Sequence, residues 1–87
     1  DPEGYLLAMR RLQERYQRRP PLGRSECLVI EDSCAGVEAA KRAGMVCLAV
    51  TTSVTADQLR YADAVVSALR QVDAPLLERL FGRIDGP

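Results

Sequence analysis

Two adjacent carboxylates, Glu31 and Asp32, are the residues of this chain best suited to chemistry. They directly follow the apolar run at 27–30, which has the pattern of a strand buried in a parallel sheet. In open α/β sheets, ligands bind beyond the carboxyl ends of the strands. Neighbouring carboxylates at such a place repel each other unless a cation lies beside them. Mg²⁺ takes oxygen ligands and is usually held by one or two carboxylates plus a substrate phosphate, so the pair is a candidate magnesium site.

A simpler interpretation of the pair also stands. Glu31 and Asp32 would then be the solvated end of a strand, with Asp32 or Ser33 capping the helix that follows. For the magnesium-site interpretation, the helix that starts after Ser33 also offers free N–H groups and the positive end of its dipole nearby.

The elements that must position the pair form a strand–helix–strand unit. The apolar runs at 27–30 and 46–50 lack alternation and predict two buried parallel strands. Between them, the segment 35–43 places Val37, Ala40 and Ala43 at three-residue spacing and is expected to be a helix that faces the sheet. Gly44 suits the position just past the end of that helix. This order predicts a βαβ unit with a right-handed crossover.

Further elements are expected on both sides of this unit. The segment 3–19 reads as a helix that Pro20 and Pro21 terminate. Its apolar stripe comprises Tyr5, Met9, Leu12 and Tyr16. Downstream we expect a polar turn at 51–53 that could line the site, a short helix at 56–60, a strand at 64–66, a helix at 75–81 and a tail at 82–87.

Composition narrows the class of protein. The 87 residues correspond to one domain or part of one, and the formal net charge is zero, which argues against a nucleic-acid partner. No apolar stretch is long enough to cross a bilayer, so no membrane partner is expected. The three cysteines form no CxxC pair, and free thiols suit a reducing compartment, so we expect a cytoplasmic protein. The start at Asp1-Pro2 suggests that the chain does not begin at a natural translation start.

The segment 27–45 closely resembles the fourth motif of haloacid dehalogenase (HAD) superfamily phosphatases. In that motif an apolar strand ends in Glu-Asp-Ser, two residues intervene, and a Gly opens a helix that ends in Ala-Gly-Met, as here at 31–45. The resemblance is greatest to the β-phosphoglucomutase and phosphoglycolate-phosphatase-like branch. The segment 1–5 looks like the end of that branch's Lys-Pro-x-Pro-x-x-Tyr motif, and 62–66 resembles its final strand. The resemblance implies an α/β fold, a partial three-layer α/β/α Rossmann-like core with parallel strands and flanking helices. Residues 1–87 would form the C-terminal part of that core domain.

The resemblance also assigns roles to the acidic turn. Asp32 matches the position that usually coordinates Mg²⁺ directly, and Glu31 matches a neighbour that joins the shell directly or through water. Ser33 and Gly36 would shape the site. The family's Asp-x-Asp nucleophile motif does not occur in this sequence, and the lysine of the third motif would precede Asp1. We therefore expect no catalytic residue within the chain, and no appreciable activity and weak Mg²⁺ binding from the chain alone.

The function implied is a magnesium-dependent phosphatase that acts on small phosphorylated metabolites through an aspartyl-phosphate intermediate. This segment would supply the metal-binding turn, and its partners would be the metabolite and the missing N-terminal part of the same protein. Two alternatives remain. One is a phosphomutase of the same family. The other is a truncated, non-catalytic protein-binding module that uses the arginines of the helix at 3–19. A dinucleotide-binding domain is disfavoured because the sequence has no Gly-x-Gly-x-x-Gly.

Overall fold

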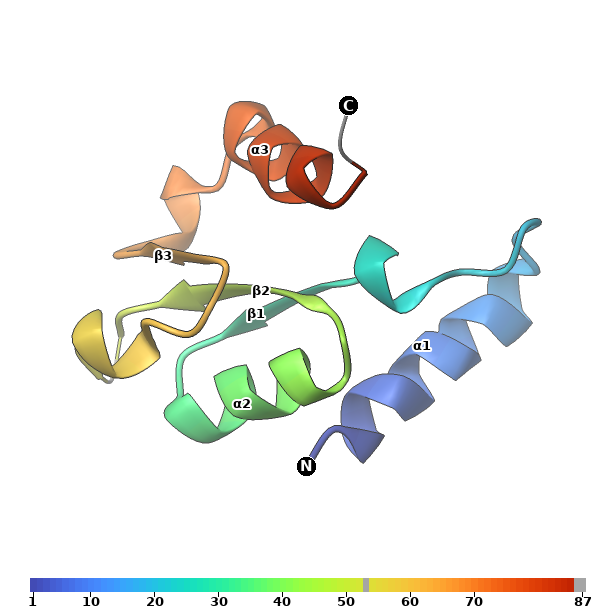
Figure 1. Ribbon diagram of the computed structural model, residues 1–87, viewed down its shortest axis with the longest axis horizontal. Helices are drawn as coiled ribbons and strands as arrows, with labels where there is room; N and C mark the ends of the chain where they lie inside the picture. The colour runs from blue at the N-terminus through green and yellow to red at the C-terminus, as the bar shows by residue number, and fades with distance from the viewer. Residues whose placement is uncertain (53, 86–87) are drawn as a thin grey trace.

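The computed structural model describes residues 1–52 and 54–85, with the side chains of 83–85 left aside. Helices and parallel strands alternate along most of the chain (Figure 1). Within the described residues, three short 3₁₀ turns connect them, at Arg24–Glu26, Asp57–Leu59 and Leu69–Gln71. The main elements are α1 (Glu3–Tyr16), β1 (Leu28–Glu31), α2 (Cys34–Arg42), β2 (Val46–Val50), β3 (Ala64–Val66) and α3 (Ala74–Asp85).

The sheet is parallel and its strands lie in the order β1-β2-β3. Its register pairs Leu28 with Val46 and Leu48 with Ala64. Helices α1 and α2 lie on one side of the sheet and α3 lies on the other (Figure 1). The predicted βαβ unit and the partial three-layer α/β/α architecture are therefore confirmed.

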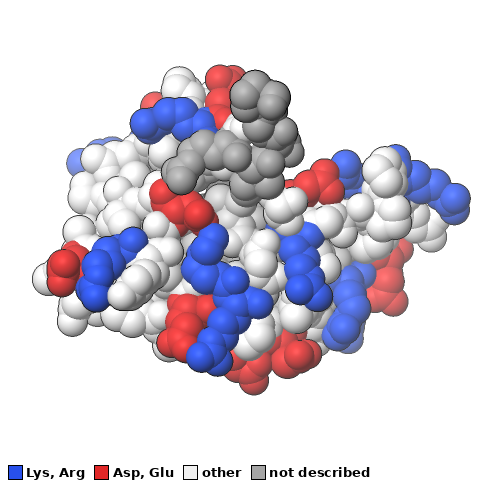
Figure 2. All heavy atoms as spheres, in the orientation of Figure 1, with Lys and Arg blue, Asp and Glu red and all other residues white. Residues whose placement is uncertain are grey.

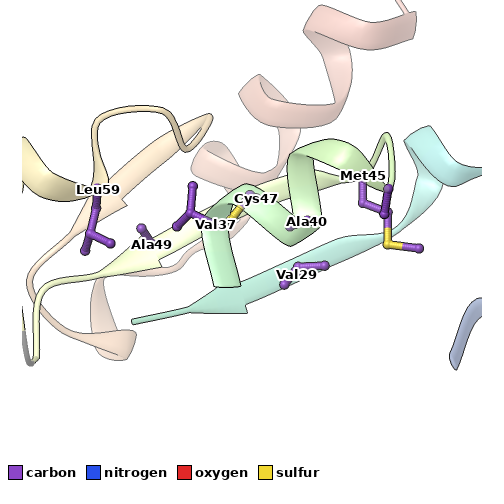
Figure 3. Packing of buried hydrophobic residues seen from close by; sticks show 8 residues of the cluster. Val29, Val37, Ala40, Met45, Cys47, Ala49 and Leu59 are labelled. Atoms are coloured by element: carbon purple, nitrogen blue, oxygen red, sulfur yellow. The ribbon is translucent and has the colours of Figure 1, made fainter. Parts of the chain in front are cut away.

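Strand β2 forms the centre of the core because helices cover both of its faces. Towards α2, Cys47 and Ala49 pack with Val29, Val37 and Ala40 (Figure 3). Towards α3, the other face of β2 forms a second cluster. That cluster consists of Val46, Leu48, Leu76 and Leu80. All five residues of β2 are buried, as its unbroken apolar pattern predicts.

The prediction of two-sided burial is wrong for the first strand. Val29 is buried under α2, but Ile30 points to the opposite face and its exposed fraction is 48%. Within the described residues β1 pairs only with β2, so it is an edge strand. One face of the apolar run of β1 is therefore left partly uncovered by the described part of the chain.

Helix α1 ends three residues earlier than predicted. Gln17 adopts a left-handed conformation (φ 48°), and its N–H donates to the Gln13 carbonyl. The Gln13 side chain then holds the chain beyond the helix, donating to the Arg18 carbonyl and accepting from the Leu22 N–H. The apolar stripe is also partly wrong, because Leu12 and Tyr16 are exposed. The residues of α1 that reach the core are Tyr5, Leu6 and Met9.

The later elements agree with prediction in type more than in length. β3 matches 64–66, and Gly44 follows α2 with φ of 78°, as expected past a helix end. The short helix expected at 56–60 is the 3₁₀ turn Asp57–Leu59. The last helix starts at Ala74 and continues to Asp85, so most of the expected tail at 82–87 is helical; residues 86–87 lie outside the described chain. The Asp73 carboxylate accepts from the Leu76 N–H and so caps this helix.

Charges of both signs are interspersed over the face shown in Figure 2, in keeping with the zero net charge. None of the helices described is both long and apolar enough to span a membrane.

Of the three cysteines, Cys34 is expected to react first with iodoacetamide and Cys47 last. Cys34 is exposed and Cys47 is buried in β2, where burial raises the pKa of its thiol to about 11. Because the thiolate is the nucleophile, little of Cys47 is reactive at neutral pH. Mass spectrometry after brief alkylation of the folded chain tests the order. Equal labelling of the two thiols would contradict the burial of β2.

Candidate functional site

The acidic turn lies at the carboxyl end of β1, next to the end of β2. An open pocket of ≈ 410 Å³ is found here. Its lining consists of Ile30, Glu31, Asp32, Val50, Thr52 and Leu69. The pocket therefore lies where ligands bind in open parallel sheets.

Glu31 is held by hydrogen bonds from three groups. Its Oε2 accepts from the Tyr5 hydroxyl at 2.6 Å. Its Oε1 accepts from the Asp32 N–H at 3.1 Å and from the Ser33 hydroxyl at 3.0 Å. These bonds, the one from Tyr5 above all, lower the pKa of the Glu31 carboxyl. The same contact raises the pKa of Tyr5 to about 12, so the neutral phenol donates to the charged carboxylate.

Of the two capping residues that the sequence allows, Asp32 and Ser33, it is Ser33 that caps α2. Its Oγ accepts from the Gly36 N–H at 3.0 Å, and its carbonyl accepts from the Val37 N–H. The Glu31 side chain occupies the space beside Gly36, and a Cβ at position 36 would overlap it. The requirement for glycine here is therefore steric.

Asp32 lies in a different environment from Glu31. Its side chain is exposed and lines the pocket, where its Oδ2 accepts from the Thr52 hydroxyl at 3.2 Å. Thr52 belongs to the segment 51–53, which the sequence suggests chiefly as a polar turn. Of that segment, the structure brings Thr52 to the site, and Ser53 lies outside the described residues.

The oxygen atoms of the turn are ligands of the kind that a hard cation prefers. They are too few to fill the coordination shell of such a cation. Both side chains offer carboxylate oxygens, the ligands that Mg²⁺ prefers. Among the described residues, no three His, Cys, Asp or Glu side chains converge in a way that could hold a metal. A cation at Asp32 would therefore take its other ligands from water, substrate or another segment of the protein.

Lys41 binds elsewhere, at the end of α2 away from Ser33. Its Nζ donates to the Met45 carbonyl at 3.1 Å and to Asp63 Oδ2 at 2.7 Å. The same Asp63 oxygen accepts from the Cys47 N–H, so this pair joins α2 to the segment between β2 and β3.

Gly36→Ala is expected to lower the free energy of unfolding by about 1–3 kcal/mol, because the new methyl group must displace Glu31 from its hydrogen bonds. Gly4→Ala is the matched control. A Cβ at position 4 meets no atom within 4 Å, and alanine is favoured over glycine inside a helix. Urea denaturation of both variants tests the prediction. An unchanged midpoint for Gly36→Ala would show that Glu31 does not need this space.

Tyr5 is a residue of this site that the sequence does not assign to it, whereas Thr52 belongs to the turn at 51–53 that could line it. Tyr5 reads as part of an apolar stripe, and its hydroxyl reaches Glu31 across 26 positions of sequence. The signal available in advance is the tyrosine itself, because a half-buried phenol usually pairs with a polar partner.

Comparisons with known proteins reveal related phosphatases and hydrolases. The chain is 39% identical over 75 residues to validoxylamine A 7'-phosphate phosphatase of Streptomyces hygroscopicus subsp. limoneus; the match covers 86% of the chain and 32% of that protein. It is 38% identical over 85 residues to a haloacid dehalogenase-like hydrolase domain-containing protein of Arabidopsis thaliana, covering 97% of the chain and 24% of that protein. A CBBY-like protein of the same plant is 46% identical over 46 residues, or 52% of the chain and 14% of that protein. The chain thus spans a third or less of these relatives. No family model and no solved structure matches it.

Proposed function

The chain belongs to the haloacid dehalogenase superfamily, and from this membership we propose that it is part of a magnesium-dependent phosphatase. Its substrates are small phosphorylated metabolites. A relative named as a phosphatase of validoxylamine A 7'-phosphate supports that class. The free cysteines support the cytoplasm as the compartment.

The acidic turn supplies the protein's metal ligands in this proposal. Asp32 holds the Mg²⁺ directly, and Glu31 joins the shell directly or through water, while Ser33 and Gly36 shape the turn. The exposure of Asp32 at the pocket is the single observation that carries the assignment. When bound, the metal neutralises negative charge on the transferring phosphoryl group. The role of this chain is to orient Asp32 through the Thr52 hydroxyl and to keep the turn rigid.

The nucleophile comes from the remaining part of the protein. A carboxylate oxygen of an aspartate attacks phosphorus, the bond from phosphorus to the alcohol oxygen breaks, and water then hydrolyses the aspartyl phosphate. The edge of β1 supports the docking of such a part. In the described chain β1 pairs on one side only, and its residue Ile30 is exposed. A parallel strand added at this edge would bring its carboxyl end next to Glu31 and Asp32.

Assays of the complete protein and of the 87-residue chain test the proposal. The complete protein is expected to hydrolyse a generic aryl phosphate, and a chelator is expected to stop the reaction. The isolated chain is expected to show no appreciable turnover, because it lacks the nucleophile. Magnesium-dependent hydrolysis by the isolated chain, or chelator-resistant hydrolysis by the complete protein, would contradict this account.

Assays of the complete protein with sugar phosphates as well as the aryl phosphate separate the two alternatives. A phosphomutase would convert a sugar phosphate into its isomer without releasing equivalent phosphate. A non-catalytic module would show neither activity in the complete protein. Its proposed binding surface would be the exposed arginines of the helix predicted at 3–19, which are Arg11, Arg15, Arg18 and Arg19.

A further inference from the structure

The shortest hydrogen bond to the acidic turn comes from a distant part of the chain. The Tyr5 hydroxyl, on the first turn of α1, donates to Glu31 Oε2 at 2.6 Å. From this contact we infer that Tyr5 is a positioning residue, which holds the Glu31 carboxylate towards α2, while the neighbouring Asp32 carboxylate stays exposed at the pocket. The part of this inference that concerns metal binding rests on the proposed function.

Glu31 passes the constraint from α1 to the start of α2. While Oε2 accepts from Tyr5, Oε1 accepts from the Ser33 hydroxyl, and Ser33 Oγ in turn accepts from the Gly36 N–H. The Glu31 side chain also fills the space that a side chain at Gly36 would need. The Glu31 carboxylate thus links α1, α2 and the turn between β1 and α2. Hydrogen bonds to a charged acceptor of this kind are stronger than those between neutral groups.

The alternation of side chains along β1 explains why the two carboxylates separate. Successive residues of a strand point to opposite faces. Val29 is buried under α2, and Glu31 follows it on that face, whereas Ile30 is exposed on the other. Glu31 and Asp32 both line the pocket, but Glu31 is half-buried and Asp32 is exposed. A hydroxyl from another element meets each carboxylate, Tyr5 for Glu31 and Thr52 for Asp32. Each carboxylate at the strand end is therefore held by its own hydroxyl donor, which limits the repulsion between the two negative charges.

Tyr5→Phe isolates the hydroxyl from the packing of the ring. The ring of Tyr5 packs against the α2 side of the core together with Leu6 and Met9, and phenylalanine preserves that packing. The matched control is Tyr16→Phe. Tyr16 lies on the same helix, and its exposed fraction is 68%. The two variants differ in whether the lost hydroxyl contacts Glu31.

Amide hydrogen exchange of the metal-free, isotope-labelled chain tests the positioning role. Tyr5→Phe is expected to speed exchange at the Asp32 and Gly36 amides about tenfold relative to the amides of β2, because both depend on the Glu31–Ser33 arrangement. Tyr16→Phe is expected to leave this ratio unchanged. A uniform increase across turn and β2, or no increase at the turn, would reduce Tyr5 to a general stabilising residue and overturn the inference.

Titration with Mn²⁺, a paramagnetic substitute for Mg²⁺, distinguishes failure of this inference from failure of the proposed function. In the wild-type chain, Mn²⁺ is expected to broaden the amide signals around Asp32, and Tyr5→Phe is expected to weaken binding about threefold or more, since the turn is no longer preorganised. Equal or tighter binding by Tyr5→Phe would contradict preorganisation. Absence of Mn²⁺ binding in the wild type would count against the proposed metal site, while the exchange ratio would still decide the role of Tyr5.

Discussion

In the complete protein, Asp32→Asn is expected to lower phosphatase turnover by about a hundredfold or more, the size of effect typical for loss of one electrostatic contact in a catalytic site. Asparagine keeps the shape of the side chain and an oxygen that the Thr52 hydroxyl can reach. It removes the negative charge that holds a divalent cation. Steady-state kinetics over a range of Mg²⁺ concentrations provide the measurement, and we expect more Mg²⁺ to be needed for half-maximal activity.

Glu38→Gln is the matched control for this charge change. Glu38 lies on the outer side of α2 and pairs with Arg42 at 2.7 Å, with both side chains mostly exposed. An exposed pair of this kind contributes little to stability, and the variant is expected to retain turnover. Asp32 is exposed too, so Asp32→Asn is expected to change the free energy of unfolding by less than about 0.5 kcal/mol. Full activity of Asp32→Asn would remove Asp32 from the proposed metal site.

The largest effect on folding is expected from Leu48→Ala, which should lower the free energy of unfolding by about 2–5 kcal/mol. Leu48 lies in the central strand, its exposed fraction is 0%, and it packs against Leu76 and Leu80 of α3. A chain of 87 residues has little stability in reserve. Circular dichroism during urea denaturation measures the change, and an unfolded variant in the absence of urea agrees with the upper part of the range.

Two further leucine variants make this result interpretable. Leu48→Met conserves volume and is expected to cost less than about 1.5 kcal/mol. Leu12→Ala removes the same atoms from an exposed position of α1, where the side chain is 49% exposed, and is expected to cost less than about 1 kcal/mol. A loss for Leu12→Ala as large as that for Leu48→Ala would contradict the burial pattern described above.

The parts of the fold that could be predicted from the sequence are those with strong local patterns. The apolar run of β2, the helix between the two strands and the glycine at 44 each carry a signal within a few residues. The end of α1 was harder to place, because Pro20 and Pro21 suggest a later stop, whereas a left-handed Gln17 terminates the helix first. The exposure of Ile30 depends on the position of β1 at the sheet edge, which local pattern does not encode.

The candidate site shows the same division. Glu31, Asp32, Ser33 and Gly36 are contiguous enough for their arrangement to be foreseen from a strand, a cap and a helix. The separate orientations of the two carboxylates could not be foreseen, because the groups that hold them come from α1 and from the turn after β2. Such contacts follow from tertiary packing, and a single sequence gives no measure of them.

Binding of a divalent cation to the 87-residue chain, followed by Mn²⁺-induced broadening of its assigned amide signals, tests the central claim most directly. We expect weak, saturable broadening centred on Asp32 and the neighbouring turn, competition by Mg²⁺, and loss of the effect in Asp32→Asn but not in Glu38→Gln. Broadening that is absent from the turn, or that survives unchanged in Asp32→Asn, would contradict the assignment of this acidic turn as a magnesium site.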